Sequence, residues 1–214
     1  MSVLNEICKS QGKRMAVIAR TIREQVTNQI RDDLVAGNFP DGCVLREAEL
    51  AKRFGVSRGP IRDAFLQLTQ EGFLAYEANR GVRLREPPDP ENREFIVSLR
   101  IQIETFVIRK GLDRLHGNVL LAVENALREL KVACEGDDVA AVARCDMAFH
   151  EAILAGCGGD DFILAWRQLC SRMLLTYTRL EDYQQVFSEH VELLEAVRAG
   201  KKQAIVAAIK SNIR

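Results

Sequence analysis

Two arginines one helical turn apart, Arg58 and Arg62, have the types and the spacing that point most directly to chemistry. Side chains four residues apart lie on one face of a helix, and a guanidinium group can donate two hydrogen bonds to O6 and N7 of guanine. Ser57 can cap such a helix or donate to a phosphate, and Gly59 allows a close approach of the backbone. The pattern predicts a helix that reads DNA from its first turn. The alternative is an exposed face with surface ion pairs.

A second set of side chains has the character of a metal site. Asp146 and His150 are spaced to project from one helix face, and His190 lies on a later segment that can return antiparallel to the first. Carboxylate and imidazole groups are ligands of zinc, nickel and similar divalent ions. The spacing predicts a site for one divalent ion. The alternative for His150 is a core histidine hydrogen-bonded to a neighbour.

The chain that must position these residues has 214 amino acids, enough for one large domain or two small ones. Thirty basic side chains balance thirty acidic ones, so any electrostatic function must come from local asymmetry. We find no apolar run long enough to span a membrane and no signal peptide, and expect a cytoplasmic protein without a membrane partner. Six cysteines without a CxxC pair are expected to be reduced thiols.

The proline-rich stretch 86–90 divides the chain, because proline fixes φ and biases the preceding residue to extended backbone. Before it, the sequence predicts a first helix, a short second helix and a third helix starting at Ser57. Alternating residues on both sides of Arg80 and Gly81 predict a β-hairpin whose outward side is basic. This is the layout of a winged helix-turn-helix. Arg80, Arg83 and Arg85 on this hairpin suit contact with phosphate or the minor groove, and the alternative is a solvated, charged strand edge. The first helix is predicted from an apolar four-residue repeat, Ile18, Ile22, Val26, Ile30 and Leu34.

After the linker the pattern is helical throughout. The short connections between the segments imply an antiparallel bundle. The predicted fold class is therefore mainly α, with an N-terminal winged helix-turn-helix and a C-terminal all-α antiparallel bundle of six or more helices. The predicted helices are 91–115, 118–134, 138–155, 161–180, 182–199 and 201–214.

The segment from about residue 20 to 85 resembles the DNA-binding domain of GntR-family bacterial transcription regulators, above all in the run GVSRGPIRDAFLQLTQEG. The resemblance implies a homodimer on a short palindromic DNA operator, with Arg58 and Arg62 reading bases. It places the wing, with Arg80 and Gly81, at the minor groove. Many relatives carry an arginine in the second helix where this chain has Ala48, and Arg46 is the nearby substitute.

Residues 91–214 resemble the FCD-type effector domain of the FadR branch of that family. The residues that carry this are Arg100 with Glu104, the run DMAFH from Asp146, and the run EHVELL from Glu189. The resemblance implies a small organic-acid effector that Arg100 helps to bind. The alternative for Arg100 is a structural ion pair with Glu104. Where relatives have a further histidine, this chain has Asn212, a weaker ligand, so the implied metal ligands are Asp146, His150, His190 and Asn212.

These patterns predict a ligand-responsive transcriptional repressor, not an enzyme, controlled by a small carboxylate metabolite and a divalent metal. Two alternatives stay open. One is a metal-dependent enzyme that uses Asp146, His150 and His190, although no general base or nucleophile stands nearby in sequence. The other is a DNA-binding protein whose helical half serves only dimerisation. The predicted parts are an N-terminal extension 1–14, a DNA-binding domain 15–85, a linker 86–90 and an effector-binding and dimerisation domain 91–214.

Overall fold

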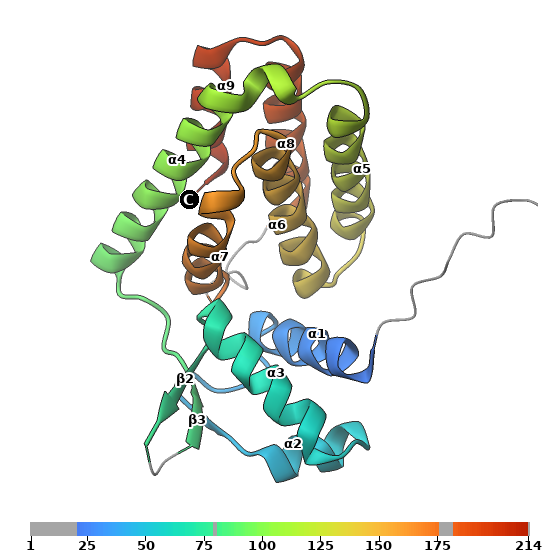
Figure 1. Cartoon of the computed structure of the whole chain (residues 1–214), viewed down its shortest axis with the longest axis vertical. Helices are drawn as coiled ribbons and strands as arrows, with labels where there is room; N and C mark the ends of the chain where they lie inside the picture. Colours follow the sequence, from blue (N-terminus) through green and yellow to red (C-terminus); the bar gives the residue numbers. More distant parts are fainter. Residues whose placement is uncertain (1–20, 79–80, 176–181, 214) are drawn as a thin grey trace, which may run out of the picture.

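The computed structural model describes residues 21–78, 81–175 and 182–213, and within them a small head lies below a helical bundle (Figure 1). The predicted extension 1–14 and Ile18 lie outside the described residues. The elements of the head are α1 (Ile22–Val35), β1 (Val44–Leu45), α2 (Glu47–Phe54), α3 (Arg58–Glu71), β2 (Leu74–Glu77) and β3 (Gly81–Leu84).

Helix α1 begins with a capping box. The Thr21 hydroxyl accepts from the Glu24 backbone N–H, and the Glu24 carboxylate accepts from the backbone N–H of Thr21. The predicted apolar repeat is wrong at Ile22, which is 60% exposed. A four-residue repeat drifts by about 40° per step around a helix of 3.6 residues per turn, so one face cannot hold all of its members. The described members on the buried face are Val26, Ile30 and Leu34.

Helices α2 and α3 form the helix-turn-helix. Gly55 ends α2 with φ at +65°, in the left-handed region that favours glycine, and Ser57 is the N-cap residue of α3. The apolar stripe predicted for the third helix is buried, at Ile61, Ala64, Phe65 and Leu68. This burial turns the opposite face of α3 outward.

The wing is a three-stranded antiparallel sheet in the order β1-β3-β2. The predicted hairpin is present as β2 and β3, in a register that pairs Leu74 with Leu84 and Tyr76 with Val82. Strand β1 was not predicted, since a two-residue strand leaves no alternation to detect. Its Val44 pairs with Arg83.

The bundle confirms the predicted mainly helical fold. Its helices are α4 (Pro90–Gly111), α5 (Gly117–Cys134), α6 (Val139–Gly156), α7 (Asp160–Leu174), α8 (Tyr183–Arg198) and α9 (Lys202–Asn212). Helix α5 packs on α6 and α8, α9 packs on α8 and α4, and α7 packs on α4 and α6. The predicted segment 91–115 is shortened, because α4 ends at Gly111 and gives way to the 3₁₀ turn η2 (Leu112–Arg114).

The head and the bundle share one apolar core. Head residues such as Ile30 and Leu68 belong to the same buried cluster as Leu130 and Val142 of the bundle. A second cluster, around Phe149 and the other bundle helices, lies within the bundle alone. Among the described residues, none of the helices is long and apolar enough to span a membrane.

Helix α7 ties the bundle to the end of α3. The Ser171 hydroxyl donates to the Glu71 carbonyl, and the Gln168 amide donates to the Gln70 carbonyl at 3.0 Å. On the neighbouring helix α6, Arg144 forms a 2.6 Å ion pair with Asp32 of α1. The C-terminal end of the predicted recognition helix is therefore held by the bundle.

Candidate functional site

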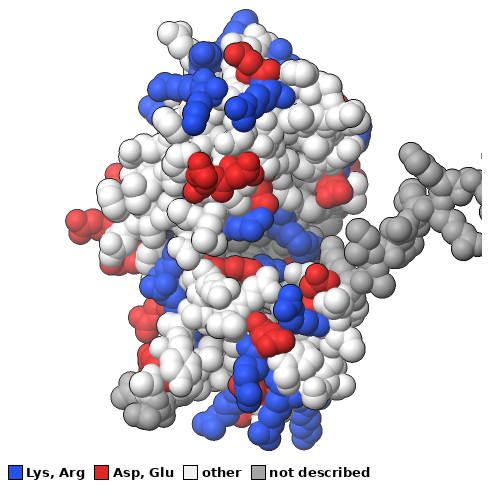
Figure 2. Space-filling model, viewed as in Figure 1, with Lys and Arg blue, Asp and Glu red and all other residues white. Residues whose placement is uncertain are grey.

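The first candidate surface is the exposed start of α3. Arg58, Gly59 and the neighbouring Ser57 are exposed, and the Arg62 side chain is 71% exposed. The Ser57 hydroxyl makes no capping hydrogen bond, so it is available to a phosphate oxygen. Figure 2 shows basic side chains gathered at the free end of the head. The geometry suits entry of the helix into a major groove, with the guanidinium groups foremost.

Arg62 has a partner that the sequence did not suggest. Its Nε and Nη2 atoms donate to the two carboxylate oxygens of Glu47, both at 3.0 Å. The hydrogen bond from Arg62 lowers the pKa of Glu47 below its usual value. Glu47 lies in the first turn of α2, fifteen residues before Arg62, and helix periodicity gives no signal for such a contact.

The remaining predicted DNA contacts differ in what surrounds them. Arg46 is exposed and lies 3.6 Å from Glu49. Gly81 is exposed with φ at +90°, and Arg80 lies outside the described residues.

The basic hairpin side contains one arginine that is engaged within the head. The Arg83 Nη1 atom donates to the Gly42 carbonyl at 2.8 Å, and Nε lies 3.3 Å from the Glu77 carboxylate. The sequence predicts contact with phosphate or the minor groove for Arg83, as for Arg80 and Arg85. Its position instead links the wing to the loop before β1. Arg85 is exposed, as a contact with DNA would require.

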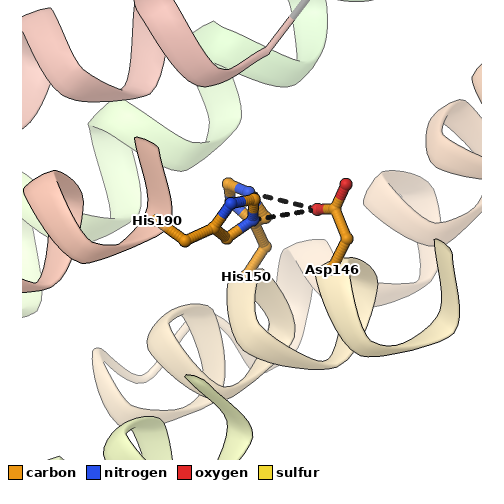
Figure 3. Close-up of side chains that lie close together, drawn as sticks. All are labelled: Asp146, His150 and His190. Atoms are coloured by element: carbon orange, nitrogen blue, oxygen red, sulfur yellow. Dashed lines mark hydrogen bonds and ion pairs between the residues drawn. The ribbon is translucent and has the colours of Figure 1, made fainter. Parts of the chain in front are cut away.

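The second candidate site lies inside the bundle, where Asp146 and His150 of α6 meet His190 of α8 (Figure 3). Both imidazole rings face one carboxylate oxygen of Asp146, with His190 Nε2 at 3.2 Å and His150 Nε2 at 3.5 Å. All three side chains are buried. The sequence-predicted trio is thus brought together, with its candidate ligand atoms within 4.8 Å of one another.

Asn212 of α9 joins this group. Its Oδ1 atom lies 2.7 Å from His150 Nε2, and its Nδ2 atom lies 3.0 Å from His190 Nδ1. His190 Nδ1 also lies 2.7 Å from the Val186 carbonyl, so this ring nitrogen is within hydrogen-bond distance of groups on both α8 and α9. The residue that replaces the expected histidine therefore occupies a position at the site.

Glu104 of α4 forms a second layer behind His150. Its carboxylate lies 2.8 Å from His150 Nδ1 and accepts from Arg100 Nε at 2.8 Å and from Trp166 Nε1 at 2.7 Å. Burial disfavours its charged form, but the positive charges and hydrogen bonds of His150 and Arg100 outweigh burial and lower the pKa of Glu104 to about 2. Sequence spacing suggested only the contact with Arg100. The link to His150 joins residues 46 positions apart.

Arg100 is buried, and its Nη2 atom has no hydrogen-bond partner among the described residues. The guanidinium group stacks 5.7 Å from the Trp166 ring centroid. The predicted ion pair with Glu104 is present, and the unpartnered Nη2 atom leaves a donor for a further acceptor. A buried donor without a partner carries a desolvation cost of about 1 to 3 kcal/mol, which a bound carboxylate would relieve.

Asp146 is held in its ionised form despite its burial. Burial disfavours the ionised form of Asp146, yet the hydrogen bond from His190 and the charges of His190, His150 and Arg100 hold the pKa of Asp146 well below its usual value. Asp146 and Glu104 are therefore carboxylates. The buried centre therefore contains two carboxylates beside the guanidinium of Arg100.

Fold and site together define the class of protein: a winged helix-turn-helix head joined to a helical sensor domain, as in DNA-binding regulators. The "Bacterial regulatory proteins, gntR family" profile matches residues 22–84, and the FCD domain profile matches residues 95–214. The chain belongs to the GntR family of bacterial transcriptional regulators and carries an FCD domain. It is a transcriptional regulator and not an enzyme.

Relatives of known role are similar over most of their length. The probable D-xylose utilization operon transcriptional repressor of Paenarthrobacter nicotinovorans is 23% identical, over 92% of this chain and 90% of the relative. The gluconate operon transcriptional repressor of Bacillus licheniformis is 25% identical, over 88% and 80%. The solved structure of McbR/YncC from E. coli superposes with a TM-score of 0.73 at 20% identity, over 91% of this chain and 94% of that one, which shows the shared fold.

Proposed function

We propose that this chain is a homodimeric repressor of the FadR branch that binds a palindromic DNA operator and responds to a small organic acid. Arg58 and Arg62 read bases, and Arg46, Ser57, Gly59, Arg80 and Gly81 position the head on the duplex. Arg100 binds the effector carboxylate. The relatives described as repressors support the sign of regulation. The single observation that carries the effector proposal is the buried, unpartnered Nη2 atom of Arg100 beside the histidine centre.

The residues at the centre fit a divalent ion. Two ligand atoms that are each about 2.1 Å from one ion lie about 3.0 to 3.4 Å apart, close to the separations between the histidine nitrogens and Asp146. Asp146, His150, His190 and Asn212 would hold the ion, which would supply a positive charge for an effector carboxylate. Glu104 orients His150 from behind, as outer carboxylates do at metal sites.

The same layer offers a route from effector to DNA. Glu104 bonds to Trp166 of α7, and α7 holds the C-terminal end of α3 through Ser171. An effector that binds one arrangement of Arg100 and Glu104 more tightly would shift α7 and so the spacing of two α3 helices in a dimer. Repression relieved by the organic acid is the expected sign.

Metal binding can be tested with a histidine control from the same chain. Purified protein would be dialysed against Zn²⁺ or Ni²⁺ and its metal content measured by mass spectrometry. We expect about one ion per chain, lost in His190→Ala and retained in His116→Ala, whose side chain is exposed at the start of α5. Equal metal content in both variants would contradict the proposed ligands.

The effector site can be tested without a known effector. A panel of small mono-, di- and hydroxycarboxylates would be screened by thermal shift and calorimetry on the metal-loaded wild type and on Arg100→Lys. Lysine keeps the charge beside Glu104 but lacks the second donor arm. We expect at least one acid to bind, about tenfold or more weakly to the variant. If none of the acids changed the melting temperature of the wild type, the result would favour the alternative in which the bundle serves only dimerisation.

A further inference from the structure

The geometry of the head points to Glu47 as the residue that positions Arg62 for base reading, and so as a determinant of operator specificity. This inference rests on the proposed role of Arg62. The two helices are joined by a pair of hydrogen bonds. Arg62 on α3 donates from both Nε and Nη2 to the carboxylate of Glu47 on α2.

The two hydrogen bonds leave a defined set of donors free. A guanidinium group has five N–H bonds, one on Nε and two on each Nη atom. Glu47 takes the edge formed by Nε and Nη2. The opposite end, with one hydrogen on Nη1 and one on Nη2, stays free and points two parallel donors in one direction. Two parallel donors are what the O6 and N7 acceptors of guanine require.

Exposure makes this restraint consequential. The Arg62 side chain is 71% exposed, and an exposed arginine without a partner samples many rotamers. Such an arginine can bind any nearby phosphate, and contacts to phosphate carry no sequence information. Glu47 selects one orientation before DNA arrives. Arg58, one turn earlier on α3, lowers the pKa of Glu47 through its charge and not through a hydrogen bond.

The negative charge of the Glu47 carboxylate also favours the operator over random DNA. Glu47 is a negative charge close to the surface that would face a polyanion, so it weakens binding to every duplex. Only a duplex that offers Arg62 a guanine edge offsets this cost. Glu47 therefore lowers affinity for random DNA while it favours the operator, and the ratio of the two affinities rises.

The test uses the full chain and duplexes selected by the wild type from a random library. Glu47→Gln keeps the shape but cannot offer both donors of Arg62 an acceptor oxygen. We expect the ratio of operator affinity to random-duplex affinity to be about tenfold lower in the variant than in the wild type. Random duplexes should bind more tightly to the variant. The slope of log affinity against log salt concentration should be steeper by about one, which corresponds to one more released counterion. The variant should relax the same base pair that Arg62→Ala relaxes, and Glu47→Gln should have no further effect on the ratio in an Arg62→Ala background.

Asp63→Asn is the matched control. Asp63 is exposed beside Arg62 on α3, so the variant removes one negative charge near the same surface without removing a hydrogen bond to Arg62. It should change affinity for operator and random duplexes alike. Thermal unfolding of all variants checks that the head stays folded.

The outcomes separate this inference from the proposed function. If Arg62→Ala leaves sequence discrimination unchanged, the base-reading role of Arg62 itself is wrong. If Arg62→Ala relaxes discrimination but Glu47→Gln behaves like Asp63→Asn, Glu47 does not position Arg62. If Glu47→Gln binds the operator more tightly with its ratio intact, Glu47 masks Arg62, and the positioning role is overturned.

Discussion

Glu104 shows how much one buried side chain can organise. It meets Arg100, His150 and Trp166 from three different helices, and each contact satisfies a group that would be costly to bury alone. The amide in Glu104→Gln removes the charge that compensates Arg100. We expect this variant to lower the free energy of unfolding by about 3 kcal/mol, because it leaves a buried guanidinium unpaired. Urea unfolding monitored by circular dichroism measures the change, and a loss below about 1 kcal/mol would refute it.

The thiols give a prediction that depends on pH. Burial raises the pKa of Cys134 and Cys157 to about 11 and that of Cys170 to about 12. The thiolate is the reactive form, so at pH 8 these three side chains should resist iodoacetamide in the folded protein and react after unfolding. Peptide mass spectrometry would compare them with the half-buried Cys43. If Cys170 were labelled at the same rate as Cys43, the result would contradict the buried position of Cys170.

For individual residues, the sequence allowed predictions about burial and contacts within one helix. The stripe of α3 predicted which side of the helix is buried, and with it the exposure of Arg58 and Arg62. The i, i+4 spacing gave the ion pair of Arg100 with Glu104. It could not give Glu47 with Arg62 or Glu104 with His150, because those contacts depend on how separate helices pack. Their roles in binding stay predictions.

Among the elements, the end of α4 depends on a glycine. A Cβ atom at Gly111 would lie 1.9 Å from the carbonyl oxygen of Cys157 at the end of α6, and a backbone atom cannot turn aside. Gly111→Ala should therefore destabilise the fold by about 3 kcal/mol, at the upper end of overpacking effects.

Gly136→Ala is the control for this effect. A Cβ atom there would meet the Ala133 carbonyl at 3.6 Å, an ordinary contact. Thermal or urea unfolding should leave this variant close to the wild type. Equal stability of the two variants would mean that α4 and α6 do not approach as closely as described.

Sequence patterns predicted the elements better than their ends. Glycines and prolines mark most boundaries of the predicted bundle helices, since both residues interrupt helical backbone, but the boundary between 161–180 and 182–199 contains neither. The 3₁₀ turn η2 and the two-residue strand β1 were missed, because neither is long enough to show a period. Such short pieces are set by their neighbours and not by local preference.

For the whole molecule, the proposed coupling predicts a variant that binds both ligands but does not respond. Trp166→Phe keeps the aromatic bulk in the bundle core but removes the hydrogen bond to Glu104. We expect DNA affinity and carboxylate affinity each to stay within about threefold of wild type, while the effect of carboxylate on DNA affinity shrinks about fivefold or more.

Leu164→Ala serves as its control, since Leu164 is 66% exposed on the same helix α7. Fluorescence anisotropy on the operator, with and without the carboxylate found by screening, measures both. A full response in Trp166→Phe would exclude this route between effector and DNA.

The apolar cluster that runs from α1 and α3 into α5 and α6 limits how the chain can be dissected. A fragment ending at the proline-rich stretch would leave Ile30, Leu68 and their neighbours without the Leu130 and Val142 side chains that complete their packing. Such a fragment should aggregate or unfold on its own. A chimera that joins this head to a new sensor domain would have to keep the last turns of α5 and the first turns of α6 with the head.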